Sequence, residues 1–275
     1  MIAAQSETPF MQRLWFLAGI ARALGIGTLA GVAAALIVGG VGSRIAMRII
    51  AITAGPGAIG AVTENGNRVG EITFGGTLGL LMFAGVFFDI PGGLVYMAVR
   101  RWLARLGRWK GVGFGFLLLA TFGSAVIESD NPDFHRFGVP VLNILLFAVL
   151  FPLFGLAVAP LVDLLERALP GVPPRRPLRM RTLGAYALAW IAAVPALLLP
   201  VALGGVLLFS ALVIVLIAVS FLAFLAGTPR GLNRLSDLSR RRGTAVAGYA
   251  ILAIPVLVGL LRTLQAIREI LQAAA

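Results

Sequence analysis

The chain has 275 residues, of which 59% are hydrophobic and 12% are charged, and its formal net charge is +12. Soluble domains carry about twice that share of charged residues, so the composition predicts a membrane protein. Cysteine is absent and His135 is the only histidine, which excludes disulfides, thiol catalysis and metal or haem sites that need two imidazoles. No catalytic cluster stands out, and we expect neither a cofactor nor an enzymatic activity.

Arginine supplies almost all of the positive charge, and Lys110 is the only lysine. The arginines gather in loops between long apolar segments. Because Lys and Arg are retained on the cytoplasmic side during insertion, we interpret these loops as topology signals that also contact anionic lipid. Binding of nucleic acid is not expected. The predicted location is a bacterial-type plasma membrane, which the chain crosses several times.

The first residues, 8–22, mix aromatic and arginine side chains, which is typical of a helix that approaches the membrane interface or of the inner end of a span. The first span is expected at about 23–43. Within it, small residues recur at every fourth position and line one helix face, where another helix backbone can come close. These helix-packing residues are Gly27, Gly31, Ala35 and Gly39.

Two arginines follow the first span. Arg44 and Arg48 are four residues apart and therefore share one helix face at its outer end. Either they form an ion-pair network with acidic residues of the outer loops, or they bind an anionic ligand. The acidic residues are Glu64, Glu71 and Glu128. The glycine-rich loop 53–73 is predicted to lie outside, with a short hairpin.

The second span, about 74–99, contains the polar interruption FFDIPGG. Counted from the outer end of the span, Asp89 lies about 20 Å into a hydrocarbon core of about 30 Å, on its cytoplasmic side. Pro91 is expected to break the helix, and Gly92 and Gly93 to loosen it. Asp89 then either caps the inner half-helix or binds a proton or cation, because a bare carboxylate at that depth is costly.

A basic stretch, residues 100–110, separates the second span from the third, which is expected at about 111–128. The loop that follows is acidic. Its side-chain oxygens make a weak candidate site for Ca²⁺ or Mg²⁺, although their spacing does not match an EF-hand. The candidate ligands are Glu128, Asp130, Asp133 and His135.

The fourth span is expected at about 139–162. A basic, proline-rich cytoplasmic linker, 166–182, then divides the single membrane domain into a four-span part, 1–165, and a three-span part, 183–275. In the second part, Pro200 and the glycines after it split a long apolar run into two spans. The remaining spans are expected at about 183–200, 204–226 and 244–262.

The basic loops alternate with acidic or uncharged ones. The predicted fold is therefore an all-α bundle of seven transmembrane helices with a cytoplasmic N-terminus and an outer C-terminus. If the run 183–226 were a single span, six helices would remain and the C-terminus would lie inside.

Two functions remain open. The first is a small ion- or proton-coupled permease, with Asp89 as its ion-binding carboxylate and Arg44 and Arg48 at the outer mouth. The second is a non-transporting assembly factor or accessory subunit, which would dock on a membrane-protein partner or on a second copy of the chain. Its docking surfaces would be the small-residue stripe of the first span and the featureless last two spans.

Overall fold

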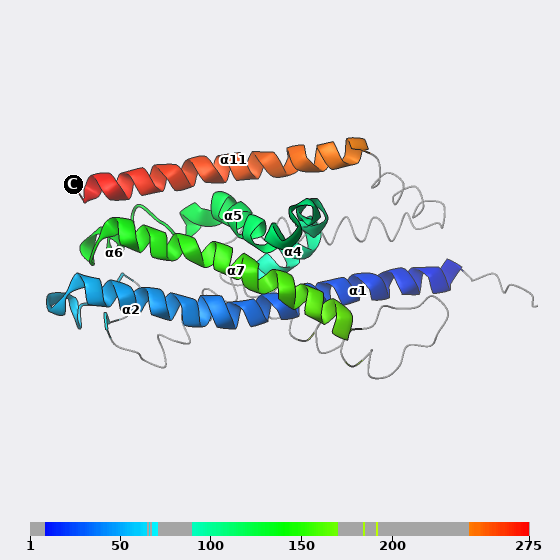
Figure 1. Cartoon of the computed structure of the whole chain (residues 1–275), viewed down its shortest axis with the longest axis horizontal. Coiled ribbons are helices and arrows are strands. Elements are labelled where there is room, and N and C mark those ends of the chain that lie inside the picture. Colours follow the sequence, from blue (N-terminus) through cyan, green and yellow to red (C-terminus); the bar gives the residue numbers. More distant parts are fainter. Residues whose placement is uncertain are drawn as a thin grey trace, which may run out of the picture.

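The computed structural model of the chain is an elongated, all-helical bundle (Figure 1). It describes residues 9–64, 66, 68–70, 90–169, 184, 191 and 242–274. Among these residues there is no β-strand, and one antiparallel bridge joins Val62 to Arg68 in the expected outer loop. The elements are α1 (Pro9–Ala34), η1 (Ala35–Gly42), α2 (Ser43–Ala54), η2 (Pro56–Ala58), α4 (Ile90–Leu103), η4 (Ala104–Trp109), α5 (Lys110–Phe122), η5 (Gly123–Ala125), α6 (Asp133–Arg136), α7 (Pro140–Ala168) and α11 (Arg242–Ala273).

Two helices of the described chain are long and apolar enough to cross a membrane. The first is the continuous run Ala18–Ala54 of 37 residues, which comprises most of α1 together with η1 and α2. The second is α7, with 29 residues. They correspond to the first and fourth of the expected spans, so the helical class and the presence of membrane-length helices agree with the sequence.

The first of these helices extends beyond the end predicted from the sequence. That end is expected near residue 43, whereas α2 continues to Ala54. The Ser43 hydroxyl donates a hydrogen bond to the carbonyl oxygen of Gly39 one turn earlier, and no proline interrupts the helix before Pro56. Gly55, with φ of +81°, ends it. Arg44 and Arg48 therefore lie inside a continuous helix and not at its end.

The other expected spans match the described helices in part. At the place expected for the third span, α5 and η5 end at Ala125, a few residues before the expected end. By contrast, α7 and α11 run to Ala168 and Ala273, beyond the expected ends of the fourth and seventh spans. The second span is described only from Ile90 onward, and the expected spans five and six lie outside the described residues, apart from positions 184 and 191.

The helices have alternating directions. We define the basic end of the bundle by Arg22, Arg100 and Lys110, and the acidic end by Glu128 and Asp133. From the basic end to the acidic end run α1 with α2, α5 and α11, whereas α4 and α7 run back (Figure 1). Contacts of α11 with the third span fix its direction: Gly259 lies against Thr121, Thr263 against Gly123, and Ile270 packs on Ile127. As a result, α7 ends and α11 begins at the same, basic end.

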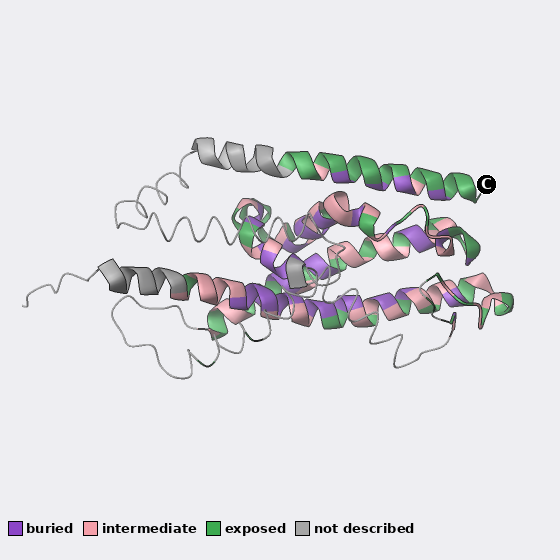
Figure 2. Ribbon diagram, turned by 180° about the vertical axis from the view of Figure 1, so that it is seen from behind, coloured by how far each residue is buried: buried purple, intermediate pink, exposed green. Residues whose placement is uncertain are grey.

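The core lies between α1, α4, α5 and α7. Tyr96, Phe114 and Phe154 form its centre, with ring centroids 5.0 Å apart between the first two and 6.5 Å between the last two. All three side chains are buried. Burial decreases toward α11, whose described part is mostly exposed (Figure 2).

Glycines determine how closely the helices approach. A β-carbon at Gly93 of α4 would overlap the carbonyl oxygen of Gly27 on α1, and one at Gly111 of α5 would stand 3.1 Å from the carbonyl carbon of Gly155 on α7. A β-carbon at Gly259 of α11 would stand 2.7 Å from the carbonyl carbon of Thr121. Such backbone contacts suit helices in lipid, where dispersion replaces the hydrophobic effect as the packing force. The residues expected to form the packing stripe, Gly27, Gly31, Ala35 and Gly39, are all buried.

Candidate functional site

Asp89, the carboxylate that the sequence singles out for ion binding, lies outside the described residues, and so does Glu71. The description resumes at Ile90, the first residue given for α4. The described residues that follow Asp89 in the sequence are those of α4, which pack against α1 and α7.

From Ile90 to Leu103 the described part of the second span is one helix, α4, which begins in the description one residue before Pro91. The helix break expected at Pro91, Gly92 and Gly93 therefore stays a prediction, because the residues before Ile90 lie outside the described part of the chain. Both glycines are buried. A β-carbon at Gly92 would come within 2.7 Å of the Phe154 ring, and Gly93 lies against α1. The glycines therefore serve close packing here and do not loosen the helix.

A buried hydroxyl lies beside this contact. Thr28 follows Gly27 on α1 and is fully buried, and within the described part of the chain its Oγ1 has no hydrogen-bond partner. A threonine in a helix commonly donates to the carbonyl oxygen one turn earlier, and a buried hydroxyl without a partner is destabilising. The Thr28 hydroxyl is thus available to bind a ligand, a water molecule or another side chain near the first described turns of α4.

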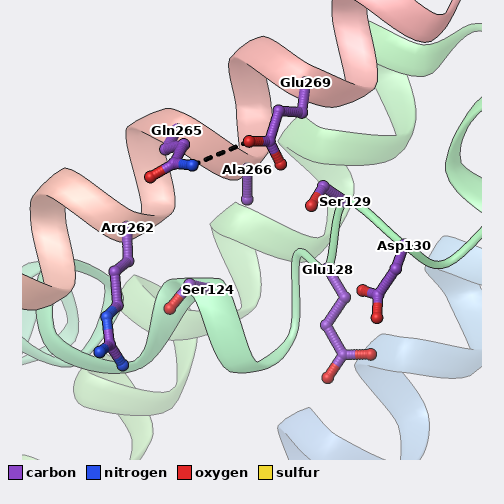
Figure 3. Close-up of a pocket in the computed structure, with 8 residues that line it drawn as sticks. All are labelled: Ser124, Glu128, Ser129, Asp130, Arg262, Gln265, Ala266 and Glu269. Atoms are coloured by element: carbon purple, nitrogen blue, oxygen red, sulfur yellow. Dashed lines mark hydrogen bonds between the residues drawn. The ribbon is translucent and has the colours of Figure 1, made fainter.

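A shallow polar groove lies at the acidic end, between the residues that follow α5 and the last turns of α11 (Figure 3). Its volume is about 210 Å³. Gln265 donates to Glu269 at 2.8 Å along its α11 wall. Carboxylates, hydroxyls and one guanidinium face the same space, so the groove has no single charge. Its lining is Ser124, Glu128, Ser129, Asp130, Arg262, Gln265, Ala266 and Glu269.

The two glutamates of the groove have opposite electrostatic surroundings. Partial burial, followed by the nearby charges of Asp130 and Glu64, raises the pKa of Glu128. Hydrogen bonds from Ser129 and then Gln265 lower the pKa of the exposed Glu269. Protonation therefore occurs first at Glu128.

The structure does not assemble the weak metal site. The candidate ligands Glu128, Asp130, Asp133 and His135 are all described, and among the described residues no three acidic or histidine side chains are close enough to hold a metal ion. Asp133 is used structurally, because one of its carboxylate oxygens accepts a hydrogen bond of 2.9 Å from the backbone nitrogen of Glu64. This bond ties the loop after α2 to α6.

Two described members of the predicted outer arginine site, Arg48 and Glu64, make backbone hydrogen bonds. Arg48 donates to the carbonyl oxygen of Gly70 at 3.4 Å, and Glu64 contributes its backbone nitrogen to Asp133. Arg136, which the sequence did not single out, donates to the carbonyl oxygen of Val62 at 3.3 Å. These contacts hold the outer loops together.

Sequence reasoning missed a charged layer at the basic end. Arg100 of α4 pairs with Glu166 of α7 at 2.6 Å, and Lys110 of α5 pairs with Asp163 of α7 at the same distance. Arg22 of α1 donates to the carbonyl oxygens of Glu166 at 2.7 Å and Leu169 at 2.6 Å. A cation at this position satisfies the last carbonyls of α7 and complements its dipole. One end of α7 is thus bound to three other helices.

One sequence signal could have revealed this layer. Asp163 and Glu166 are three residues apart, so they share one face at the end of an otherwise apolar helix. Two carboxylates in that position need cations, and the basic segments expected on the same side are 100–110 and 166–182. Pairing specific residues across such sequence distances requires the helix packing, which the sequence alone does not provide.

Comparison with models of known families, with curated proteins and with solved structures finds no match for this chain. The functional argument therefore depends on the chain's own residues.

Proposed function

We propose that the chain is a multi-pass protein of a bacterial-type plasma membrane, with seven transmembrane helices, a cytoplasmic N-terminus and an outer C-terminus. The directions of the described helices support this topology. Since α7 ends and α11 begins at the basic end, the described helix directions agree with the two spans expected from the sequence at about 183–200 and 204–226. The cations gathered at the basic end suit the cytoplasmic side.

Within this architecture, we propose that the protein works as a small ion- or proton-coupled permease, with Asp89 as the ion-binding carboxylate. The observation that carries the proposal is the depth at which α4 meets α1. Gly93 touches Gly27 and Gly31, which lie five and nine residues beyond Arg22 and hence about 7–14 Å into the bundle from its charged layer. In the sequence, Asp89 precedes Gly93 by four residues and follows the apolar run of the expected second span.

Chemistry at that depth supports ion binding. An ionised carboxylate in hydrocarbon costs several kcal/mol, roughly, unless a proton, a cation, water or a polar partner compensates its charge. Thr28, next to Gly27 on the facing helix, is a buried hydroxyl without a hydrogen-bond partner among the described residues and is a candidate second ligand. Uptake and release of a proton or cation by this carboxylate would couple ion movement to substrate movement.

The test uses proteoliposomes that enclose a pH-sensitive dye. An imposed membrane potential should drive proton uptake by the wild-type protein, and Asp89→Asn should abolish the pH-dependent part of the flux. Asp130→Asn serves as the matched control, because it removes the same charge from an exposed position in the outer loop. Unchanged flux in Asp89→Asn, or an equal loss in both variants, would contradict the permease.

A second candidate is a non-transporting accessory or assembly subunit. It is favoured by the exposed apolar side chains of α11, which no described element covers. Ile254, Leu257 and Leu261 are 67%, 57% and 68% exposed. Their spacing of three and four residues makes one face, which suits a partner helix as well as lipid. Purification in mild detergent followed by mass spectrometry separates the candidates, since only an accessory subunit requires a stoichiometric protein partner.

A further inference from the structure

The basic connection between α4 and α5 divides its cations into two groups. Its five basic residues cannot be distinguished in the sequence. In the structure, Arg100 and Lys110 turn inward and pair with the carboxylates of α7. Arg101 and Arg108 are exposed. Among the described residues, their assigned contacts are with aromatic rings and not with carboxylates. The two acidic residues of α7, Asp163 and Glu166, are therefore paired with Lys110 and Arg100 and not with Arg101 or Arg108.

Each outward arginine lies next to a tryptophan. The guanidinium carbon of Arg101 is 4.2 Å from the ring centroid of Trp102, and that of Arg108 is 5.4 Å from the centroid of Trp109. A guanidinium that lies on an aromatic ring keeps its N–H groups directed outward in its own plane, where they can donate to two oxygens of one acceptor. The cation–π contacts thus orient both arginines without using their hydrogen-bonding capacity.

The turn η4 (Ala104–Trp109), which follows Trp102 and contains Arg108 and Trp109, is exposed over its whole length. Its apolar members, Leu106 and Trp109, are 46% and 54% exposed. The turn directly precedes Lys110, which pairs with Asp163 at the basic end of the bundle. Arginine, tryptophan and leucine close together in the chain are typical of the boundary between acyl chains and headgroups.

We propose that the surface formed by Arg101, Trp102, Arg108 and Trp109 binds the headgroup phosphate of an anionic phospholipid. This proposal depends on the membrane architecture proposed above, though not on the permease activity. The two guanidinium groups donate to the phosphate oxygens, the indole rings lie at headgroup level, and Leu106 contacts the upper acyl chain. An anionic lipid is preferred over a zwitterionic one, because the latter carries its own cation and gains less from the field of the arginines.

The chain supplies an internal comparison at its other end. Arg136 is also exposed and lies over an aromatic ring, 5.0 Å from the centroid of Phe137. It differs in that it donates to the carbonyl oxygen of Val62 and sits in the acidic loop next to His135. A single arginine that is already engaged in a loop contact should not select anionic lipid.

The experiment measures lipids retained by the purified full-length protein. The protein is reconstituted in nanodiscs of equal amounts of phosphatidylcholine and phosphatidylglycerol, released in the mass spectrometer, and its bound lipids are identified. We expect the wild type to retain phosphatidylglycerol over phosphatidylcholine. Arg101→Gln and Arg108→Gln should each lower that ratio about fivefold, the weight of one cation near an anionic headgroup. Arg136→Gln is the matched control and should leave the ratio unchanged.

Every outcome decides the proposal. Equal retention of both lipids by the wild type, or an equal loss in Arg136→Gln, would overturn it. Variants that keep the charge, Arg101→Lys and Arg108→Lys, should retain most of the preference, which separates lost charge from lost folding. Asp89→Asn should leave lipid retention unchanged, so an inactive permease and an absent lipid site give different results.

Discussion

Gly93 of α4 lies so close to Gly27 of α1 that a β-carbon at position 93 would overlap the carbonyl oxygen of Gly27. The same β-carbon would stand 2.8 Å from the backbone nitrogen of Gly31. Two backbones in contact cannot separate to admit a side chain without losing the packing around them. This contact fixes the position of α4 against α1.

Gly93→Ala should therefore destabilise the protein. Overpacking of a close contact typically costs about 1–3 kcal/mol, and here the obstruction is backbone, which cannot rotate away. The melting temperature in detergent, followed by circular dichroism, should fall. Gly19→Ala is the control. Gly19 lies on α1, the helix that Gly93 contacts, and a β-carbon there would meet nothing within 4 Å. Equal melting temperatures for the two variants would show that α4 and α1 do not touch at this point.

The pair of Lys110 and Asp163 should couple the start of α5 to the end of α7. The two side chains are 30% and 40% exposed, so solvent screening limits the expected coupling to about 1 kcal/mol. In a double-mutant cycle with Lys110→Gln and Asp163→Asn, the double variant should lose less stability than the two single variants together. The cycle of Lys110→Gln with Glu269→Gln should be additive, because Glu269 lies at the acidic end. Additivity in both cycles would rule out the ion pair.

The helical class was predictable from the sequence because it follows from composition. Apolar runs of about 20 residues have few folds available in lipid, where backbone groups must bond internally. The two membrane-length helices fall where expected for the same reason. Helix ends were less predictable. A helix can continue past the edge of the hydrocarbon core until a helix-breaking residue ends it, and in α2 these residues are Gly55 and Pro56, after Ala54.

Contacts between distant residues were not predictable from local patterns. Arg22 reaches the end of α7 across 144 and 147 positions, and nothing near Arg22 in the sequence identifies Glu166 or Leu169 as its partners. For Gly92 and Gly93 the pattern had two physical meanings, flexibility and small size, and only the neighbouring helix decides between them. In α4 the neighbour is within contact distance, so small size is what the fold uses.

Stability should depend on pH through Glu128. Its pKa is raised from the ordinary value of 4.5, mainly by burial and then by Asp130 and Glu64. A carboxyl group with a raised pKa favours the folded state at low pH and loses that contribution as pH rises through the folded-state pKa. Glu128→Gln should therefore raise the melting temperature at pH 7 relative to the wild type, and the difference should disappear below about pH 4.5.

Glu269 should behave in the opposite way, although it lines the same groove. Hydrogen bonds from Ser129 and Gln265 lower its pKa, so its ionised form stabilises the fold above the ordinary pKa, and this contribution is lost as pH falls through the lowered one. Glu269→Gln should lower the melting temperature at pH 7 and match the wild type in acid. The pH profiles of the two variants, recorded in one buffer series, check both signs, and profiles that shift in the same direction would contradict the assignment.

The membrane topology can be tested with single cysteines, because the natural chain contains none. Ala104 in η4 and Ala274 at the end of α11 are both exposed and lie at opposite ends of the bundle. With a cytoplasmic basic end, a membrane-impermeant maleimide applied to intact spheroplasts should label Ala274→Cys, and Ala104→Cys only after permeabilisation. Val41→Cys, at an exposed apolar position of η1, should resist labelling in both conditions, because lipid covers it. Labelling of Ala104→Cys and Ala274→Cys from the same side would contradict the helix directions. Labelling of Val41→Cys by the aqueous reagent would mean that the first long helix does not lie in the bilayer.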